Sequence, residues 1–167
     1  MNKENACALV EWEFARENTI EIIKNLGNEG LNIELPRPGL NTFKKHFQEM
    51  MAIEESYING IKTGKMTFCS NEEKYENLNT VQELLDNMKI LDNELKTVMS
   101  NTDFNYEIKW EYGEIKTVAS HLCALSTHEL FHIGQMVAFM YVLNLSIPPF
   151  LIENWSLPIQ EVSEHEI

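Results

Sequence analysis

The chain has 167 residues, 44% hydrophobic and 23% charged, which is the size and composition of one globular domain, and we predict a single domain over residues 1–167. Its formal net charge of −13 repels the phosphate backbone of nucleic acids, so we expect no nucleic-acid partner. No secretory signal is visible, the apolar runs are too short to cross a membrane, and the three cysteines are scattered, which together predict a cytoplasmic protein with no membrane partner.

Apolar residues recur at helical spacing in four stretches of the chain. The first helix is expected over residues 7–26, and the glycines in segment 27–30 end it. A loop that contains prolines follows. The second helix is expected over residues 42–61, and Asn41 or Thr42 can cap its start because either side-chain oxygen accepts a free helix N–H group.

Polar residues fill segment 64–79, which predicts a long loop before the third helix. That helix begins at a capping box from Thr80 to Glu83 and ends near residue 100. Alternating residues over 104–113 then favour a short extended segment or hairpin.

The fourth and longest helix is expected over residues 115–145, and Pro148 and Pro149 prevent its continuation. The remaining residues form a tail that packs through Phe150 and Trp155. Four amphipathic helices of this length bury their apolar stripes against one another. The sequence therefore predicts an all-α protein, a four-helix bundle with at most a short extended segment before the last long helix.

His128 and His132 lie four residues apart on the fourth predicted helix, which places their Cβ atoms about 6 Å apart on one face. They share that face with apolar residues, and burying two imidazoles there is costly unless their nitrogens have partners. A divalent metal ion satisfies one nitrogen of each ring. The alternative is a pair of core histidines that bond to neighbouring side chains.

A third ligand has to come from another helix, and His46, near the start of the second helix, is the best candidate. Three histidines leave at least one coordination position open, as catalytic metal sites do. The alternative for His46 is a histidine at a helix boundary that bonds to water.

Four other polar residues draw attention. His121 lies two turns from His128, too far to share an ion, and is expected to be packed or hydrogen-bonded; His165 in the tail is expected to be solvated. Gln135, one turn beyond His132, either orients a ligand from outside the coordination shell or satisfies backbone groups in the core. Glu54 falls within an apolar stripe; its carboxylate either contacts a ligated histidine or reaches solvent at the edge of the bundle, and the second is expected.

The segment from His128 to Gln135, together with His46 in the segment from Phe43 to Glu49, resembles the DinB/YfiT-like superfamily of metal-binding four-helix bundles. The resemblance implies that His46, His128 and His132 bind nickel or zinc and that the protein is a homodimer. It also implies a link to transferases that use a low-molecular-weight thiol such as bacillithiol or mycothiol. Ile133 stands where members often have arginine, so an anion contact by that arginine is not expected here.

The leading functional prediction is a metal-dependent enzyme that acts on a small molecule, either as a thiol transferase or as a hydrolase. His128 to His132 also satisfies the HExxH pattern of zinc peptidases, in which Glu129 would be the general base and Glu153 a third ligand. Two further alternatives are a non-catalytic binding bundle in which the metal ion only stabilises the fold, and a helical interaction domain without metal.

Overall fold

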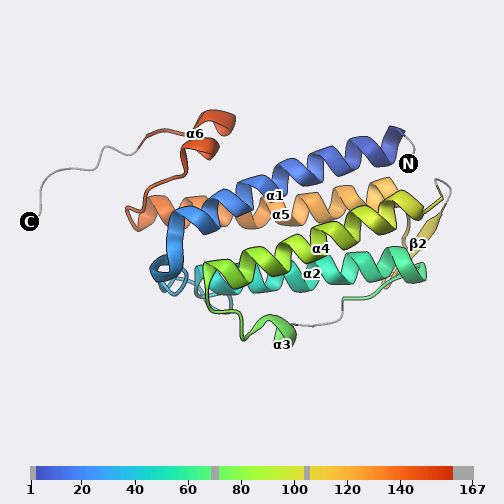
Figure 1. Ribbon diagram of the computed structural model, residues 1–167, viewed down its shortest axis with the longest axis horizontal. Helices are drawn as coiled ribbons and strands as arrows, with labels where there is room; N and C mark the ends of the chain where they lie inside the picture. The colour runs from blue at the N-terminus through green and yellow to red at the C-terminus, as the bar shows by residue number, and fades with distance from the viewer. Residues whose placement is uncertain (1–2, 69–71, 104–105, 160–167) are drawn as a thin grey trace, which may run out of the picture.

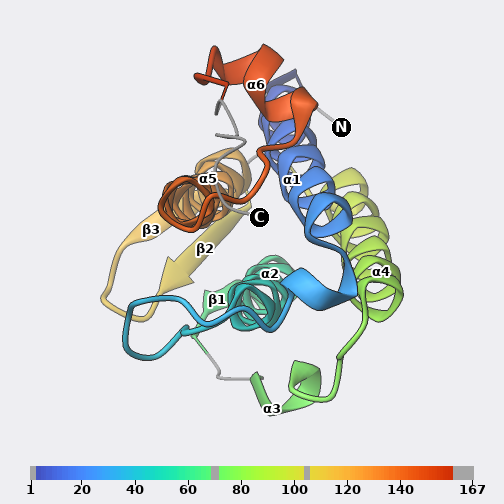
Figure 2. The same ribbon diagram turned by 90° about the vertical axis from the view of Figure 1, so that its left-hand side faces the viewer.

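Four long helices pack side by side in the computed structural model, which describes residues 3–68, 72–103 and 106–159. They are α1 (Lys3–Gly30), α2 (Phe43–Thr63), α4 (Val81–Asn101) and α5 (Val118–Val142). Seen from the end of the bundle, α1 packs against α5 and α4, and α2 packs against the same two helices (Figure 2). The predicted all-α four-helix bundle is confirmed.

Local sequence signals set most of the helix ends. The Thr42 hydroxyl accepts a hydrogen bond from the Lys45 N–H at 3.3 Å and caps α2. Thr80 and Glu83 form the predicted capping box, in which each side chain accepts from the backbone N–H of the other. In α1 the backbone breaks at Gly27, where φ is 60°, although helical turns continue to Gly30.

A small sheet lies at one end of the bundle and corrects two sequence predictions. Strand β2 (Glu107–Trp110) lies in the extended segment predicted over residues 104–113, of which positions 104 and 105 lie outside the described residues. Its hairpin partner, β3 (Ile115–Thr117), lies beyond that segment, with Ile108 opposite Lys116. The fourth helix begins at Val118 rather than at residue 115, because residues 115–117 pair with β2.

The predicted loop over residues 64–79 was also partly wrong. It holds strand β1 (Lys65–Met66), which pairs with β2 in parallel, and the short helix α3 (Glu72–Tyr75). The left-handed conformation of Gly64, with φ of 71°, turns the chain from α2 into β1, and its N–H donates to the Gly60 carbonyl.

The C-terminal segment forms helix α6 (Pro149–Trp155), which packs on α1. The Trp155 indole N–H donates to the Asn18 side-chain oxygen at 2.8 Å, and its ring lies 5.7 Å from that of Phe14. Phe150 packs against the core, so the predicted docking through Phe150 and Trp155 is confirmed. The end of the tail, including His165, lies outside the described residues. None of the described helices has the length and hydropathy of a membrane span.

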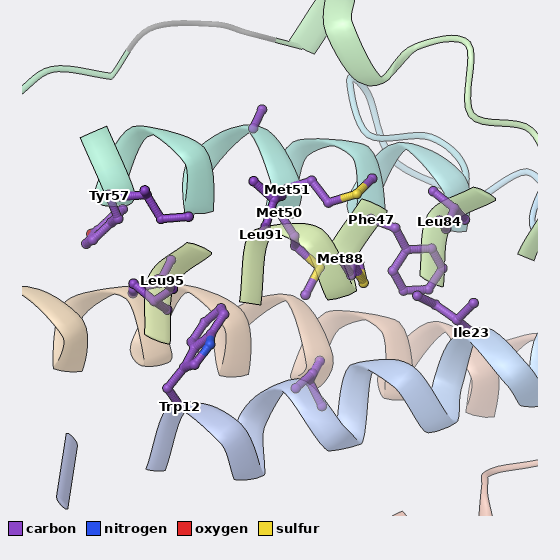
Figure 3. Close-up of a cluster of buried hydrophobic side chains, with 14 of the residues drawn as sticks. Trp12, Ile23, Phe47, Met50, Met51, Tyr57, Leu84, Met88, Leu91 and Leu95 are labelled. Carbon is purple, nitrogen blue, oxygen red and sulfur yellow. The ribbon is translucent and has the colours of Figure 1, made fainter. Parts of the chain in front are cut away.

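Apolar side chains from α1, α2 and α4 fill the interior of the bundle (Figure 3). Trp12, Phe47, Met50, Leu84 and Met88 are among those almost completely removed from solvent. Burial of this apolar surface is the main source of stability for a bundle of this size. It provides a rigid frame for the polar groups described next.

A buried ion cluster joins all four long helices. The guanidinium of Arg16 on α1 contacts Glu54 of α2 at 2.6 Å, Glu129 of α5 at 3.0 Å and Asp92 of α4 at 3.2 Å. The prediction that Glu54 reaches solvent was wrong, because Arg16 draws its carboxylate into the interior, where it is fully buried. Burial raises the pKa of Glu54 well above its usual range despite the opposing charge of Arg16, and the charges of Asp92 and Glu129 act in the same direction as burial.

We expect Arg16→Ala to lower the free energy of unfolding by about 3–5 kcal/mol, because it leaves buried carboxylates without their cation. Glu54→Gln should lower the free energy of unfolding clearly less than Arg16→Ala does. The amide has the shape of a neutral carboxyl group, which is the form that the raised pKa of Glu54 favours. Urea denaturation of both variants at neutral pH compares the two costs. Equal costs would show that Arg16 is not the centre of the cluster.

His121 on α5 is a fully buried histidine held by two hydrogen bonds. Its Nε2–H donates to the Tyr57 carbonyl at 3.0 Å, and its Nδ1 accepts from the Trp110 indole at 3.1 Å. Gly60 leaves room for the ring: a Cβ there would lie 3.1 Å from His121 Cε1, so that a side chain would push the ring or the helix back. Burial lowers the pKa of His121 to about 4, which outweighs the opposing effect of the Tyr57 carbonyl, and the charge of Lys116 lowers it further. The predicted packed and hydrogen-bonded role is confirmed.

This lowered pKa makes His121 a source of acid sensitivity. The unfolded chain binds a proton at His121 below its ordinary pKa of 6.5, whereas the folded chain does so only near pH 4. The contribution of the neutral ring to the free energy of unfolding is therefore fully present above pH 6.5. It is lost as the pH falls from 6.5 to 4, and the loss is up to about 3 kcal/mol. His121→Gln, compared with wild type in metal-free urea titrations across this window, should lose less stability on acidification. Parallel pH curves for the two proteins would contradict the assignment.

Candidate metal centre

Side chains from the second turn of α2 and the middle of α5 converge on one point. His132 Nε2 lies 2.9 Å from Glu49 Oε2 and 3.2 Å from His128 Nε2, and His128 Nε2 lies 3.3 Å from Glu49 Oε1. One ligand atom from each of these residues lies within 4.8 Å of the other two. The two histidines thus face one carboxylate across the contact between the helices.

Helix geometry explains this convergence. His128 and His132 are one turn apart and project from the side of α5 that meets α2, as the sequence predicted. The His132 side chain is only 5% exposed, whereas those of His128 and Glu49 are 24% and 20% exposed. The cluster is therefore buried on one side and accessible to a small molecule on the other.

The donor atoms fit a divalent metal ion. Glu49 Oε2 is buried and lies 2.9 Å from His132 Nε2, but their geometry is not that of a hydrogen bond, and the oxygen has no other partner among the described residues. His128 Nδ1 is also buried and has no hydrogen-bond partner among them. Donor atoms that share a tetrahedral ion at bonds of about 2.0–2.2 Å lie roughly 3.3–3.6 Å apart. The separations of 3.2 and 3.3 Å to His128 Nε2 are near this range, and the 2.9 Å between His132 Nε2 and Glu49 Oε2 is shorter, so those two groups would move slightly apart around an ion. Two imidazoles and a carboxylate are a donor set that suits zinc, nickel and related ions.

Electrostatics keep the carboxylate charged. Burial acts to raise the pKa of Glu49, but the close contacts and charges of His128 and His132 lower it to about 2. Glu49 is therefore ionised near neutral pH, which is the state that a metal ligand requires.

His46 lies directly beside this cluster and is fully buried. The Nδ1 of His46 lies 2.9 Å from the Nδ1 of His132, whereas the Nε2 of His132 faces Glu49. The Nε2 of His46 is buried and has no hydrogen-bond partner among the described residues. Burial lowers the pKa of His46 to about 4, and the charges of His132 and Arg37 add to this effect. The ring is thus neutral near pH 7 and able to bind a metal or accept a hydrogen bond. Its role as a third ligand stays a prediction.

Glu49 is the residue that sequence reasoning missed. It follows His46 by three residues, so both project from the same side of α2. That spacing was the available signal, but carboxylates are common on helix surfaces and spacing alone does not distinguish a ligand from a solvated glutamate. Only the packing of α2 against α5 places Glu49 opposite the two histidines.

Gln135 lies one turn beyond His132, and its side-chain oxygen accepts a hydrogen bond from Arg37 in the loop between α1 and α2. It therefore anchors that loop beside the cluster. Its predicted role in orienting a ligand stays a prediction.

Glu129 points away from the cluster. It is fully buried, accepts a hydrogen bond from the Thr19 hydroxyl at 2.6 Å and pairs with Arg16, so it faces α1. Glu153 is exposed on α6, which packs on α1. The peptidase interpretation therefore has neither its general base nor its third ligand beside His128 and His132.

Comparisons with known proteins agree with this architecture. No curated protein matches the chain, whereas the family model described as "DinB family" matches residues 1–143, a segment that contains all four long helices and every residue of the cluster. This match confirms the resemblance found in the sequence around His46 and His128–Gln135. The chain belongs to the DinB family.

Proposed function

We propose that this protein is a metal-dependent enzyme that transfers a low-molecular-weight thiol onto a small electrophile. The observation that carries the proposal is the convergence of Glu49, His128 and His132 at a largely buried position that solvent still reaches. The ion is nickel or zinc, for which imidazole and carboxylate are suitable ligands. The predicted homodimer and cytoplasmic location stay predictions.

Each residue of the centre has a distinct role in this proposal. Nε2 of His128, Nε2 of His132 and the carboxylate of Glu49 hold the ion, and His46 orients His132 through its opposite nitrogen. Three protein ligands leave a position open for substrate. When bound there, a divalent ion lowers the pKa of a thiol, so that the reactive thiolate is available near neutral pH.

The fold itself argues against the alternative of a purely structural staple. Arg16 already connects α2 and α5 through Glu54 and Glu129. The apolar core also holds these helices together. The two helices that carry the ligands are therefore held together without an ion. A metal centre placed at an accessible edge of such a frame favours chemistry over scaffolding.

Metal analysis of purified variants tests the ligand set. We expect wild type to bind about one divalent ion per chain, and His128→Ala, His132→Ala and Glu49→Ala to lose it after dialysis. His46→Ala should weaken binding by about 10–100-fold, as the loss of a residue that orients a ligand does.

His121→Gln serves as the matched control, because it changes a buried histidine of the same helix and should keep the ion. If His46→Ala lost the ion completely and Glu49→Ala kept it, the three-histidine set predicted from the sequence would replace the set with Glu49.

The proposed reaction is tested with 2-mercaptoethanol and other small thiols against 1-chloro-2,4-dinitrobenzene. The thiol sulfur forms a bond to the ring carbon, the carbon–chlorine bond breaks, and chloride and the thiol proton are released. We expect turnover with the nickel or zinc form, loss on chelation, and a fall of at least about 100-fold in His128→Ala.

Thermal melting of the same samples distinguishes a catalytic metal ion from one that only stabilises the fold. An enzyme of this kind should remain folded after chelation. Unfolding on chelation, with no metal-dependent turnover in any combination of thiol and electrophile, would support the structural role instead.

A further inference from the structure

A cavity of about 400 Å³ opens beside the candidate metal centre. One wall is formed by Glu49 of α2, and another by residues of the loop between α1 and α2, including Arg37 and Leu40. Figure 2 shows this loop, in blue, running past the end of α2. A molecule in the cavity would therefore touch both the loop and a candidate metal ligand.

Two cations line this cavity. Arg37 is half-buried, and its guanidinium donates to the side-chain oxygen of Gln135 and to the carbonyl of Pro38. Lys45 is exposed in the first turn of α2, and its ammonium donates to the Asn41 side-chain oxygen at 2.7 Å. All three acceptors are neutral oxygens, which hold the side chains in place and leave their charges uncompensated.

Neither cation has an acidic partner among the described residues, although the chain has 26 acidic and 13 basic residues. Over residues 3–68, 72–103 and 106–159, neither Arg37 nor Lys45 forms an ion pair, a property they share with several exposed lysines such as Lys89 and Lys109; what distinguishes them is that both line the cavity beside Glu49.

Arg37 is also positioned to act on the centre itself. Gln135, which holds its guanidinium, lies one turn from His132, and the charge of Arg37 contributes to the lowered pKa of His46. A guanidinium has five N–H groups, and two of its nitrogens are engaged here, so donors remain for a ligand.

The acidic groups of the cavity do not cancel this positive charge. Glu49 faces the histidines, and Glu76, which also lines the cavity, is exposed. With a divalent ion on Glu49, the ion and the two cations outweigh the two carboxylates. The cavity is then an electropositive pocket on a strongly acidic protein, which concentrates anions of small size.

We infer that Arg37 and Lys45 bind an anionic group, such as a carboxylate, on the small molecule that reaches the metal centre. This inference rests on the proposed function and narrows its substrate to acidic thiols. The guanidinium of Arg37 matches a carboxylate through paired hydrogen bonds, and Lys45 adds charge at the mouth.

Binding of thiols to the cobalt-substituted protein tests the inference without measuring activity. A thiolate that binds Co²⁺ produces a charge-transfer absorption band, which can be titrated with mercaptosuccinate, a thiol with two carboxylates, and with neutral 2-mercaptoethanol. We expect wild type to bind mercaptosuccinate about tenfold or more tightly than 2-mercaptoethanol at low salt, and succinate to compete with it.

The preference for mercaptosuccinate should fall to about twofold in Arg37→Gln, and to an intermediate value in Lys45→Gln. Lys96→Gln is the matched control, because Lys96 is exposed on α4 and paired with Glu13, and it should keep the full preference. Circular dichroism and cobalt content establish that each variant is folded and loaded. Lys45→Gln, at an exposed position, provides the test if Arg37→Gln does not fold.

The outcomes separate the inference from the function on which it rests. Equal affinities of wild type for the two thiols, or a preference unchanged in both Arg37→Gln and Lys45→Gln, would overturn the anion pocket and leave the thiol transferase intact. No charge-transfer band with any thiol would overturn the proposed function, and the anion pocket with it.

Discussion

The guanidinium of Arg16 lies where water is excluded and contacts carboxylates from the three other long helices. Buried charges of this kind are tolerated only when their partners are in place, so a shift of one helix along another would expose or strand a charge. The contact therefore fixes the register of α2 and α5. Glu54 follows Glu49 by five residues, and Glu129 directly follows His128. The residues that set the register are thus neighbours, along the same two helices, of the residues that form the metal centre.

Helix α5 separates its polar groups by direction. Successive residues of a helix point about 100° apart, so His128 and His132 face α2 while Glu129 faces α1. The same five residues that satisfy the HExxH pattern therefore serve two different purposes. The histidines belong to the candidate metal centre, and the glutamate belongs to the cluster around Arg16. A linear motif does not reveal this division, because it depends on which helix packs against each side of α5.

Charge is also distributed unevenly at the metal centre. The chain is strongly acidic, yet the cavity beside Glu49 carries two cations without acidic partners among the described residues. The loop between α1 and α2 brings Arg37 to this position, and Gln135 of α5 holds it there. The proposed substrate would thus meet positive charge only close to the centre, which gives selectivity for small anions without attracting polyanions to the whole surface.

The sequence by itself determined the helices, their caps and the histidine pair, because each depends on contacts within a few residues along the chain. Thr42, the box of Thr80 and Glu83, and the spacing of His128 and His132 are local features of this kind. The short strands were only partly predicted, because β1 exists through pairing with a segment more than forty residues away, Lys65 with Lys109. Tertiary structure alone decided that Glu54 is buried, that Glu49 faces the histidines and that Arg37 lies beside them. These positions depend on which helix faces meet, and the free energy that selects those faces comes from the apolar core and the buried charges as a whole.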